Sequence, residues 1–229
     1  MPFWVLALLS LALGAQCAWQ LSRAPTLYRE DLPPAPRAQA LRLASFAEDE
    51  AAARLTMLYL QTFDFGGGNR IPYQKLDYTR LVGWLESILE LDPRSDYPLF
   101  SAARIYAEVP DPARSRIVLE FIYRAFFDDP NRRWPWLAHA SLVAKHRLGD
   151  LPLALRYAQA VQRHTTDPKV PLWARQMEIF ILEDMDELEA AKIMIRDLLE
   201  SGRIYDPAEL RFLKQRLEEL EGRLSKSRR

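Results

Sequence analysis

An Asp-Pro dipeptide recurs at nearly even intervals, and this recurrence constrains the fold more than any other feature of the sequence. The prolines Pro93, Pro130, Pro168 and Pro207 are separated by 37, 38 and 39 residues. Proline disfavours α geometry in the residue before it, so each dipeptide is a predicted helix boundary. An interval of this size is typical of stacked helical hairpins, in which neighbouring units bury one another's apolar faces.

Amphipathic helical patterns fill the intervals between these prolines. In LVGWLESILEL, the apolar residues at 81, 84, 85, 88 and 89 have the spacing that places them on one face of a helix. The predicted helix pairs are 44–63 with 76–91, 97–109 with 112–127, 134–148 with 151–165, and 171–184 with 187–201, before a single helix at 207–224. Eight glycines against 16 prolines also favour sharply ended helices over tight strand hairpins. The predicted fold class is all-α.

The last predicted helix, residues 207–224, carries a leucine seam with spacings of 3, 4, 3 and 4 residues. The seam consists of Leu210, Leu213, Leu217, Leu220 and Leu224. A terminal cap on the helical array and a coiled-coil dimer would both use such a seam. Because the run spans only about two heptads, we expect a cap rather than a coiled coil.

Three stretches carry a resemblance to a known family: ILELDP at 88–93, LGDLPLALRYAQAV at 148–161 and DELEAAKIMIRDLL at 186–199. Here the chain resembles the tetratricopeptide-like (TPR-like) α-solenoid repeat family. Ala154 and Ala190 match the small residue that this family has early in the second helix of a unit. Leu142 and Glu178 depart from the small residue expected inside the first helix, and the units are several residues longer than usual.

The resemblance covers residues 44–224 in architecture, although specific residues match in only two units. It implies a right-handed α-solenoid of helical hairpins whose first helices line a binding groove. Other α-solenoids stay open as alternatives. We therefore expect a helical repeat domain over residues 41–224, followed by a short basic tail at 225–229.

The N-terminal stretch FWVLALLSLALGAQCAW, residues 3–19, contains no charged residue, and extension to Leu21 gives 19 residues. This is close to the length of a membrane-spanning helix, and Trp4 and Trp19 lie near its two ends, where indole rings favour the bilayer interface. Met1 and Pro2 supply no basic residue of the kind that precedes a cleaved signal. Residues 1–23 are therefore predicted to be a transmembrane anchor of the bacterial inner-membrane type, or an uncleaved signal. Cleavage after export is the alternative.

The single cysteine, Cys17, lies inside this apolar stretch and is interpreted as a small apolar residue, with acylation as the alternative. The first basic residues come after the stretch, at Arg23, Arg29, Arg37 and Arg42. Because positive charge stays in the cytoplasm, this favours a single-pass protein with a cytoplasmic helical domain. The acidic residues Glu30 and Asp31 among the arginines keep a periplasmic location open. Residues 24–40, rich in proline, are predicted to be a semi-rigid linker.

Composition and motifs argue against several function classes. Lys plus Arg equals Asp plus Glu at 31 each, and the resulting zero net charge argues against a general nucleic-acid binder. The run GGGN at 66–69 lacks the remaining residues of a phosphate-binding loop. His139 and His146 lie two helical turns apart, about 10 Å, which is too far for one metal ion. No catalytic motif is present, so no enzyme activity, cofactor, metal or small-molecule substrate is predicted.

The predicted function is a membrane-anchored scaffold or adaptor that binds protein partners, or an accessory subunit of an inner-membrane complex. An exported periplasmic protein, and an enzyme with an unrecognised groove site, are the alternatives. The predicted partner-binding groove consists of Tyr97, Phe100, Arg104, Trp136, His139, His146, Arg147, Arg175 and Glu183. Tyr, Trp and Arg dominate interface energetics. Packing of Trp134 and Trp136 between units is the competing interpretation.

Overall fold

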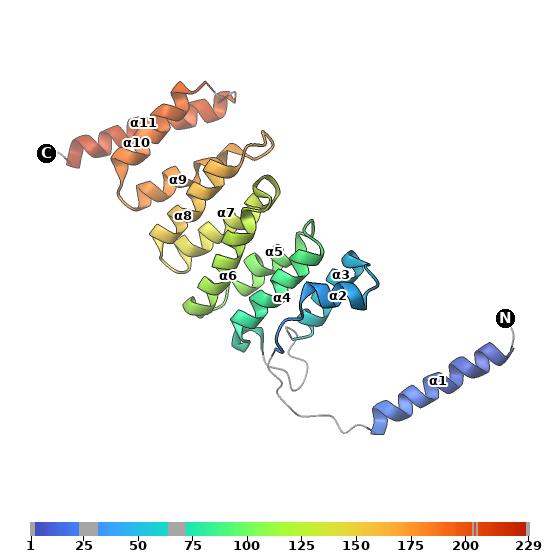
Figure 1. Ribbon diagram of the computed structural model, residues 1–229. Coiled ribbons are helices and arrows are strands. Elements are labelled where there is room, and N and C mark those ends of the chain that lie inside the picture. Colours follow the sequence, from blue (N-terminus) through green and yellow to red (C-terminus); the bar gives the residue numbers. More distant parts are fainter. Residues whose placement is uncertain (1–2, 23–31, 64–71, 203, 205, 228–229) are drawn as a thin grey trace.

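A computed structural model describes residues 3–22, 32–63, 72–202, 204 and 206–227, and within these residues the chain forms helices and no strands. The all-α prediction is therefore confirmed. The predicted loop around Gly66–Gly68 and the last two residues of the basic tail lie outside the described residues. The helices are α1 (Phe3–Ser22), α2 (Ala38–Ala44), α3 (Asp49–Gln61), η1 (Tyr73–Lys75), α4 (Tyr78–Leu91), α5 (Tyr97–Ser101), η2 (Ala102–Tyr106), α6 (Pro112–Phe126), α7 (Pro130–His146), α8 (Leu151–His164), α9 (Leu172–Asp184), α10 (Leu188–Glu200) and α11 (Pro207–Ser227) (Figure 1).

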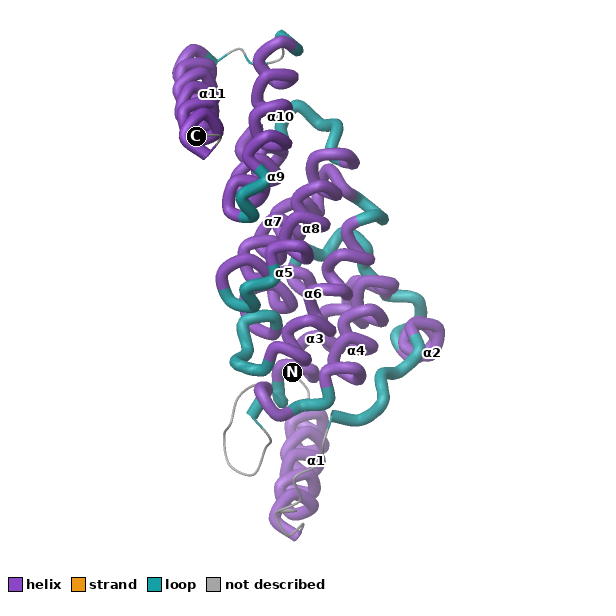
Figure 2. Tube along the Cα trace, turned by 90° about the vertical axis from the view of Figure 1, so that its left-hand side faces the viewer, coloured by secondary structure: helices purple, strands orange, loops and turns teal. Residues whose placement is uncertain are grey.

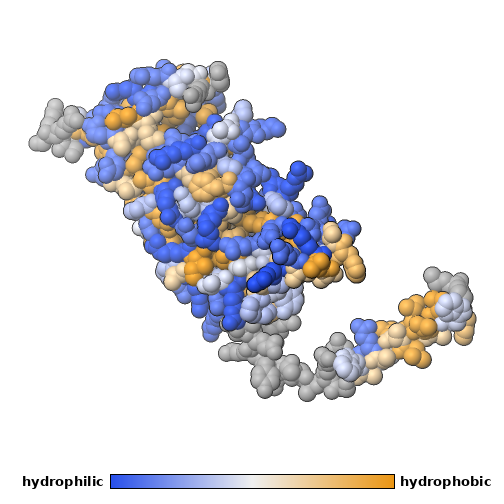
Figure 3. Space-filling model, in the orientation of Figure 1, coloured by the Kyte–Doolittle hydropathy of each residue, from blue (hydrophilic) through white to orange (hydrophobic). Residues whose placement is uncertain are grey.

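The uncharged N-terminal stretch forms one helix, α1, which stands apart from the other helices in Figure 1. Apolar side chains including Phe3, Trp4 and Trp19 are exposed along it. Much of the surface of this helix is orange in Figure 3. Among the described residues, no helix combines the length and the apolar character that a membrane crossing requires. The expected transmembrane span is therefore not supported. Its apolar run is at the short limit for a span and contains the polar Gln16.

The segment before α2 packs against α4 instead of standing free as a spacer. We call residues 32–37 the strap. Leu32 in the strap is fully buried, and Ala38, the first residue of α2, is 2% exposed. The part of the predicted linker before residue 32 lies outside the described residues. Within the described residues, the packed body therefore includes the strap from residue 32, whereas the sequence interpretation placed the start of the helical domain at residue 41.

The helix predicted at 44–63 corresponds to α3, which begins only at Asp49, while α2 lies before it and ends at Ala44. The chain turns between them through Phe46 and Ala47, with φ angles of 55° and 67°. Residues with a side chain rarely adopt this left-handed conformation, and neither Gly nor Asn marks the turn in the sequence. Arg42 fixes the turn by pairing with Asp49 at 3.0 Å and by donating to the Glu90 carbonyl at 2.9 Å.

From α3 to α11 the helices follow one another in chain order, and Figures 1 and 2 both show successive helices side by side. We call α5 with η2, α7 and α9 the first helices, and α4, α6, α8 and α10 the second helices. Asp111 caps α6 by accepting from the amides of Ala113 and Arg114, as the Asp-Pro pattern predicts. Helix α7 starts at Pro130, four residues before the predicted start, because the Asp129-Pro130 dipeptide opens it.

The core consists of two apolar clusters. The larger one runs from Leu32 to Ile181 and joins α2–α9, and the smaller one joins α9, α10 and α11. Ala154, one of the two small residues that the resemblance singled out, is fully buried, whereas in α10 the fully buried alanine is Ala191 rather than Ala190. Glu178, where a small residue was expected, is also buried and accepts a hydrogen bond from Gln159 on α8 at 2.9 Å.

Helix α11 closes the C-terminal end of the body. Its seam residues Leu213 and Leu220 are both 1% exposed and belong to the smaller cluster, with Leu217 and Leu224 packed against it at partial burial. The seam is therefore covered by α9 and α10 of the same chain. This arrangement agrees with the expected cap and leaves the buried leucines unavailable to a coiled-coil partner.

Candidate functional site

Side chains from a neighbouring unit hold two of the Asp-Pro segments. Arg132 and Arg133, at the start of α7, both donate to the carbonyl of Pro93, which lies about one proline interval earlier. Arg133 is 3% exposed; it also donates to the Ala125 carbonyl and pairs with Asp128 at 2.8 Å. Carbonyls just after a helix end lack helical partners, and these guanidinium groups satisfy them.

The segment at Asp167-Pro168 is held in a different way. The side-chain oxygen of Asn131 accepts from the backbone amides of Thr166 and Asp167, at 2.7 and 2.9 Å. The Asn131 amide group also donates to the Thr166 hydroxyl at 3.2 Å, and Arg175 donates to the Asp167 carbonyl. These contacts join the residues that follow Asp129-Pro130 to the segments at Asp92-Pro93 and Asp167-Pro168.

Aromatic residues of the predicted groove form a row along the first helices. Tyr97 and Phe100 on α5 stack with their centroids 6.2 Å apart, and Phe100 meets the edge of Trp136 on α7 at 5.8 Å. Gln61 on α3 donates to the Tyr97 hydroxyl. Tyr97 is 46% and Phe100 40% exposed, so both rings reach solvent while Trp136 is partly buried beneath them. The row therefore combines packing between units with an exposed aromatic surface.

An ionic group extends this row toward the end of α7. Arg104 contacts Nδ1 of His139 at 3.3 Å, and Nε2 of His139 contacts the Glu108 carboxylate at 3.1 Å. A guanidinium only donates, so Nδ1 accepts and Nε2 carries the proton that it donates to Glu108. Arg147 lies 4.0 Å from the same carboxylate. We call Tyr97, Phe100, Arg104, Trp136, His139 and Arg147 the first-helix row.

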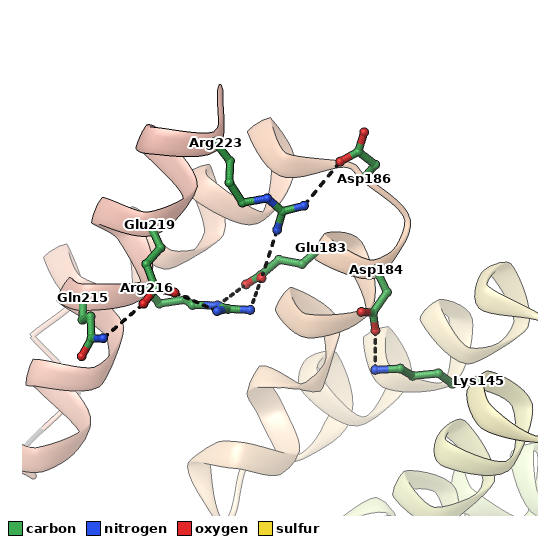
Figure 4. Close-up of polar contacts among 8 residues, drawn as sticks. All are labelled: Lys145, Glu183, Asp184, Asp186, Gln215, Arg216, Glu219 and Arg223. Atoms are coloured by element: carbon green, nitrogen blue, oxygen red, sulfur yellow. Dashed lines mark hydrogen bonds and ion pairs between the residues drawn. The ribbon is translucent and has the colours of Figure 1, made fainter. Parts of the chain in front are cut away.

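Three residues of the predicted groove are not part of this row. His146 is exposed on α7, and Arg175 takes part in the Asp167 contact described above. Glu183 is buried at the other end of α9, where it accepts two hydrogen bonds from Arg216 of α11 (Figure 4). Arg223 lies 4.0 Å from Glu183 and reaches Asp186 at 3.6 Å, so this group of charges joins α9 to α11.

A groove of about 690 Å³ lies on the second helices, where sequence reasoning proposed no site. Residues from three consecutive second helices line it: Thr79, Val82, Gly83 and Glu86 of α4, Arg116, Ile117, Glu120 and Arg124 of α6, and Leu153, Arg156 and Tyr157 of α8. We call this the second-helix groove. Its size is in the range of ligand-binding clefts. The sequence contained a signal for this groove. Two glutamates, Glu86 and Glu120, are 34 residues apart, and two arginines, Arg124 and Arg156, are 32 residues apart.

Ion pairs between neighbouring second helices cross the groove. Arg124 pairs with Glu86 at 2.7 Å, and Arg156 pairs with Glu120. The Arg156 guanidinium also lies over the Tyr157 ring, 5.2 Å from its centroid. Burial raises the pKa of the Tyr157 hydroxyl to about 12, so this phenol stays neutral and cannot serve as an ionised base at physiological pH.

The N-terminus of α8 contributes one further charge beside the groove. Asp150 caps α8 by accepting from the Leu153 amide at 2.9 Å, and it pairs with Arg116 at 2.6 Å. The hydrogen bond from the Leu153 amide and the Arg116 guanidinium lower the pKa of the Asp150 carboxyl, against an opposing effect of burial. The Asp150 carboxylate is therefore ionised, and both the Leu153 amide and the Arg116 guanidinium bind it. This is the behaviour of a structural helix cap rather than of a catalytic acid.

No family model, curated protein or solved structure matches this chain. Among the described residues, no group of three or more His, Cys, Asp or Glu side chains is placed to hold a metal ion. The first-helix row presents aromatic rings and charged side chains, and the second-helix groove presents paired charges.

Proposed function

We propose that this chain is a helical-repeat scaffold of the TPR-like kind, in which the first-helix row binds a protein partner. The observation that carries the proposal is the exposure of Tyr97 and Phe100 in a row that continues across two units to His139 and Arg147. Partly exposed aromatic rings beside arginines are the side chains that contribute most to protein interfaces.

The arrangement of the helices supports the repeat part of the proposal. Contacts between units recur at sequence separations near the proline interval, such as Arg124 with Glu86 at 38 residues and Asn131 with Thr166 at 35 residues. In a helical solenoid each unit contacts mainly its neighbours, which produces this kind of recurrence. Small-angle X-ray scattering tests the shape: an elongated particle is expected, and a sphere-like profile would contradict a solenoid.

Site-specific photo-crosslinking tests the binding surface in cells. A photoreactive phenylalanine analogue replaces Phe100 in one variant and Phe212, a 48% exposed residue on α11, in a matched control. The proposal predicts a defined adduct with one partner from position 100, which mass spectrometry then identifies, and no such adduct from position 212. Equal adducts from both positions, or none from position 100, would contradict the proposal.

Location at a bacterial inner membrane, with the body in the cytoplasm or exported to the periplasm, stays a prediction from the sequence. Cell fractionation of the full chain and of a variant lacking residues 3–21 tests it directly. Recovery of both proteins in the same fraction would remove any role of the N-terminal stretch in localisation. Reporter fusions after residue 40 and at the C-terminus separate the cytoplasmic from the periplasmic alternative.

A further inference from the structure

The strap shows how the second helices hold an extended chain. Three side chains on one face of α4 donate hydrogen bonds to three strap carbonyls: Arg80 to Leu32, Trp84 to Pro33 and Ser87 to Pro36, each at 2.8 Å. Proline has no backbone amide hydrogen, and extended proline-rich segments make no internal backbone hydrogen bonds, so their carbonyls need outside donors. Helix α4 supplies these donors at intervals of one helical turn.

The strap lies close to the backbone of α4 at Gly83. A Cβ atom at this position would approach the Cβ of Ala35 to 3.3 Å, so the absence of a side chain lets the extended chain sit low on the helix. Gly83 and Glu86 border a hollow beside the strap and also line the second-helix groove. The surface that the strap occupies is therefore continuous with the groove over α6 and α8.

The groove repeats the chemistry that holds the strap. Arg116, Arg124 and Arg156 are each about half exposed, and each guanidinium has five donors, of which its ion pair uses only part. Glu86 accepts from Arg124 and Glu120 from Arg156, each through one carboxylate oxygen. Three guanidinium groups with five donors each exceed the roughly four acceptor sites on each of these two carboxylates. This excess of donors suits a ligand that offers carbonyls and few amide hydrogens.

This balance discriminates between kinds of peptide. An α-helical peptide satisfies its own carbonyls and would leave the arginines without new partners. A β-strand would bring as many amide hydrogens as carbonyls, and its amides would compete with the arginines for the carboxylates of Glu86 and Glu120. A proline-rich extended segment offers carbonyls without those amide hydrogens, and the exposed Ile117 and the half-buried Leu153 provide apolar contacts for its rings.

We propose that the second-helix groove binds an extended, proline-rich segment of a partner protein, in line with the chain's own strap. Crossing from α4 to α8 takes two interhelical spacings, roughly 20 Å. At about 3.1 Å per residue, a polyproline II segment of roughly six residues spans this distance. The second-helix groove and the first-helix row lie on different sets of helices. The binding proposed for the groove can therefore be tested independently of the function proposed for the row.

Fluorescence anisotropy with the full-length chain in mild detergent tests this site. The probe is a labelled peptide that contains two copies of LPPAPR, the sequence of the strap, and its control has every proline replaced by alanine. We expect saturable binding of the first peptide and at least about fivefold weaker binding of the second. Arg124→Ala and Arg156→Ala should each weaken binding about fivefold or more, and Arg156→Lys should also weaken it because lysine lacks the planar donor fork.

The matched control is Arg196→Ala on α10, an arginine of similar exposure whose ion pair lies outside the groove; it should bind like the wild type. Far-UV circular dichroism confirms that each variant keeps its helices. The proposal is overturned by the absence of saturable binding, by equal binding of the alanine peptide, or by groove variants that bind like the wild type. Sedimentation could instead show a dimer of the wild-type chain that Arg156→Ala abolishes. That result would mean that the groove binds the strap of a second copy, and it would overturn the proposal of a partner protein. Crosslinking from position 100 would be unchanged in all these cases.

Discussion

Replacing Arg216 with alanine leaves a carboxylate without its main partner in the interface between α9 and α11. The side chain of Glu183 is 4% exposed and accepts from Nε of Arg216 at 3.0 Å and from Nη2 of the same guanidinium. The geometry is bidentate (Figure 4). Arg216 itself is 35% exposed, so it can turn toward water when Glu183 is removed. The two halves of this ion pair should therefore respond unequally to substitution.

The expected magnitudes follow from this difference in burial. Removing one partner of a buried ion pair costs roughly 3–5 kcal/mol, because the remaining charge is uncompensated. Arg223 lies 4.0 Å from Glu183 and compensates part of that charge, so we expect Arg216→Ala to lower the free energy of unfolding by about 3 kcal/mol. Glu183→Gln removes the buried charge and keeps an oxygen acceptor, so we expect a loss of about 1 kcal/mol.

A second ion pair near the same helix provides the control. Arg196 on α10 and Glu221 on α11 are 2.7 Å apart, and both are about half exposed. Exposed pairs contribute about 0–1 kcal/mol, so either alanine variant should change stability by less than that. Urea unfolding followed by far-UV circular dichroism measures all four variants, and hydrogen exchange of the α11 amides shows whether this helix is released first.

The result that would refute this reasoning is a symmetric one. If Arg216→Ala and Glu183→Gln cost the same, the burial of Glu183 is not the source of the effect. If Arg196→Ala costs as much as Arg216→Ala, the contribution comes from general electrostatics between α11 and the rest of the body. High salt separates these cases further, because screening weakens exposed pairs more than buried ones.

Three further predictions concern the joints, the α8 cap and the strap. Arg133→Met should lower the free energy of unfolding by about 1–3 kcal/mol in urea titrations, because the carbonyl of Ala125 loses the charged donor of a buried hydrogen bond; an unchanged midpoint would contradict this. The lowered pKa of Asp150 means that its ionised form stabilises the fold above the ordinary Asp pKa of about 3.9, and that this stability is lost as pH falls through the lower folded pKa. Asp150→Asn should therefore reduce the stability difference between about pH 3 and pH 6, measured by thermal unfolding at each pH, and an equal slope would argue against the cap. Gly83→Leu should displace Ala35 and speed tryptic cleavage after residue 37, with circular dichroism unchanged; protection equal to the wild type would show that the strap does not depend on close approach.

The sequence was sufficient to predict the all-α body, because apolar residues at helical spacing and the Asp-Pro boundaries are local signals. It was insufficient where the backbone conformation is set by distant contacts. The turn at Phe46 and Ala47 has no glycine, and Arg42 holds it through the Glu90 carbonyl, 48 residues away. The start of α7 was placed at residue 134, whereas the helix begins at Pro130 and continues through Pro135.

The candidate site was likewise predictable where it depends on the regular array and unpredictable where it depends on distant contacts. The contact of Phe100 with Trp136 joins positions one unit apart, so a regular helical array was enough to bring them together. Glu183 lies apart from the first-helix row because α9 passes into the smaller cluster, where α11 covers its C-terminal end. The second-helix groove was not predicted because its charged residues face solvent, whereas the helical patterns were interpreted only through their buried apolar residues. The prolines of the strap also suggested a spacer rather than a packed segment.

Two of the Asp-Pro segments are held by different chemistry: guanidinium groups donate to the Pro93 carbonyl, and an asparagine side chain accepts from the amides of Thr166 and Asp167. Adjacent units are thus not interchangeable. Duplicating or deleting one unit by recombination would place these side chains opposite segments that they do not fit, so the hydrogen bonds between units would be lost. Arrays of identical repeats change length by gaining or losing whole units. This array resists such changes, because the specific hydrogen bonds between its units fix their number and order.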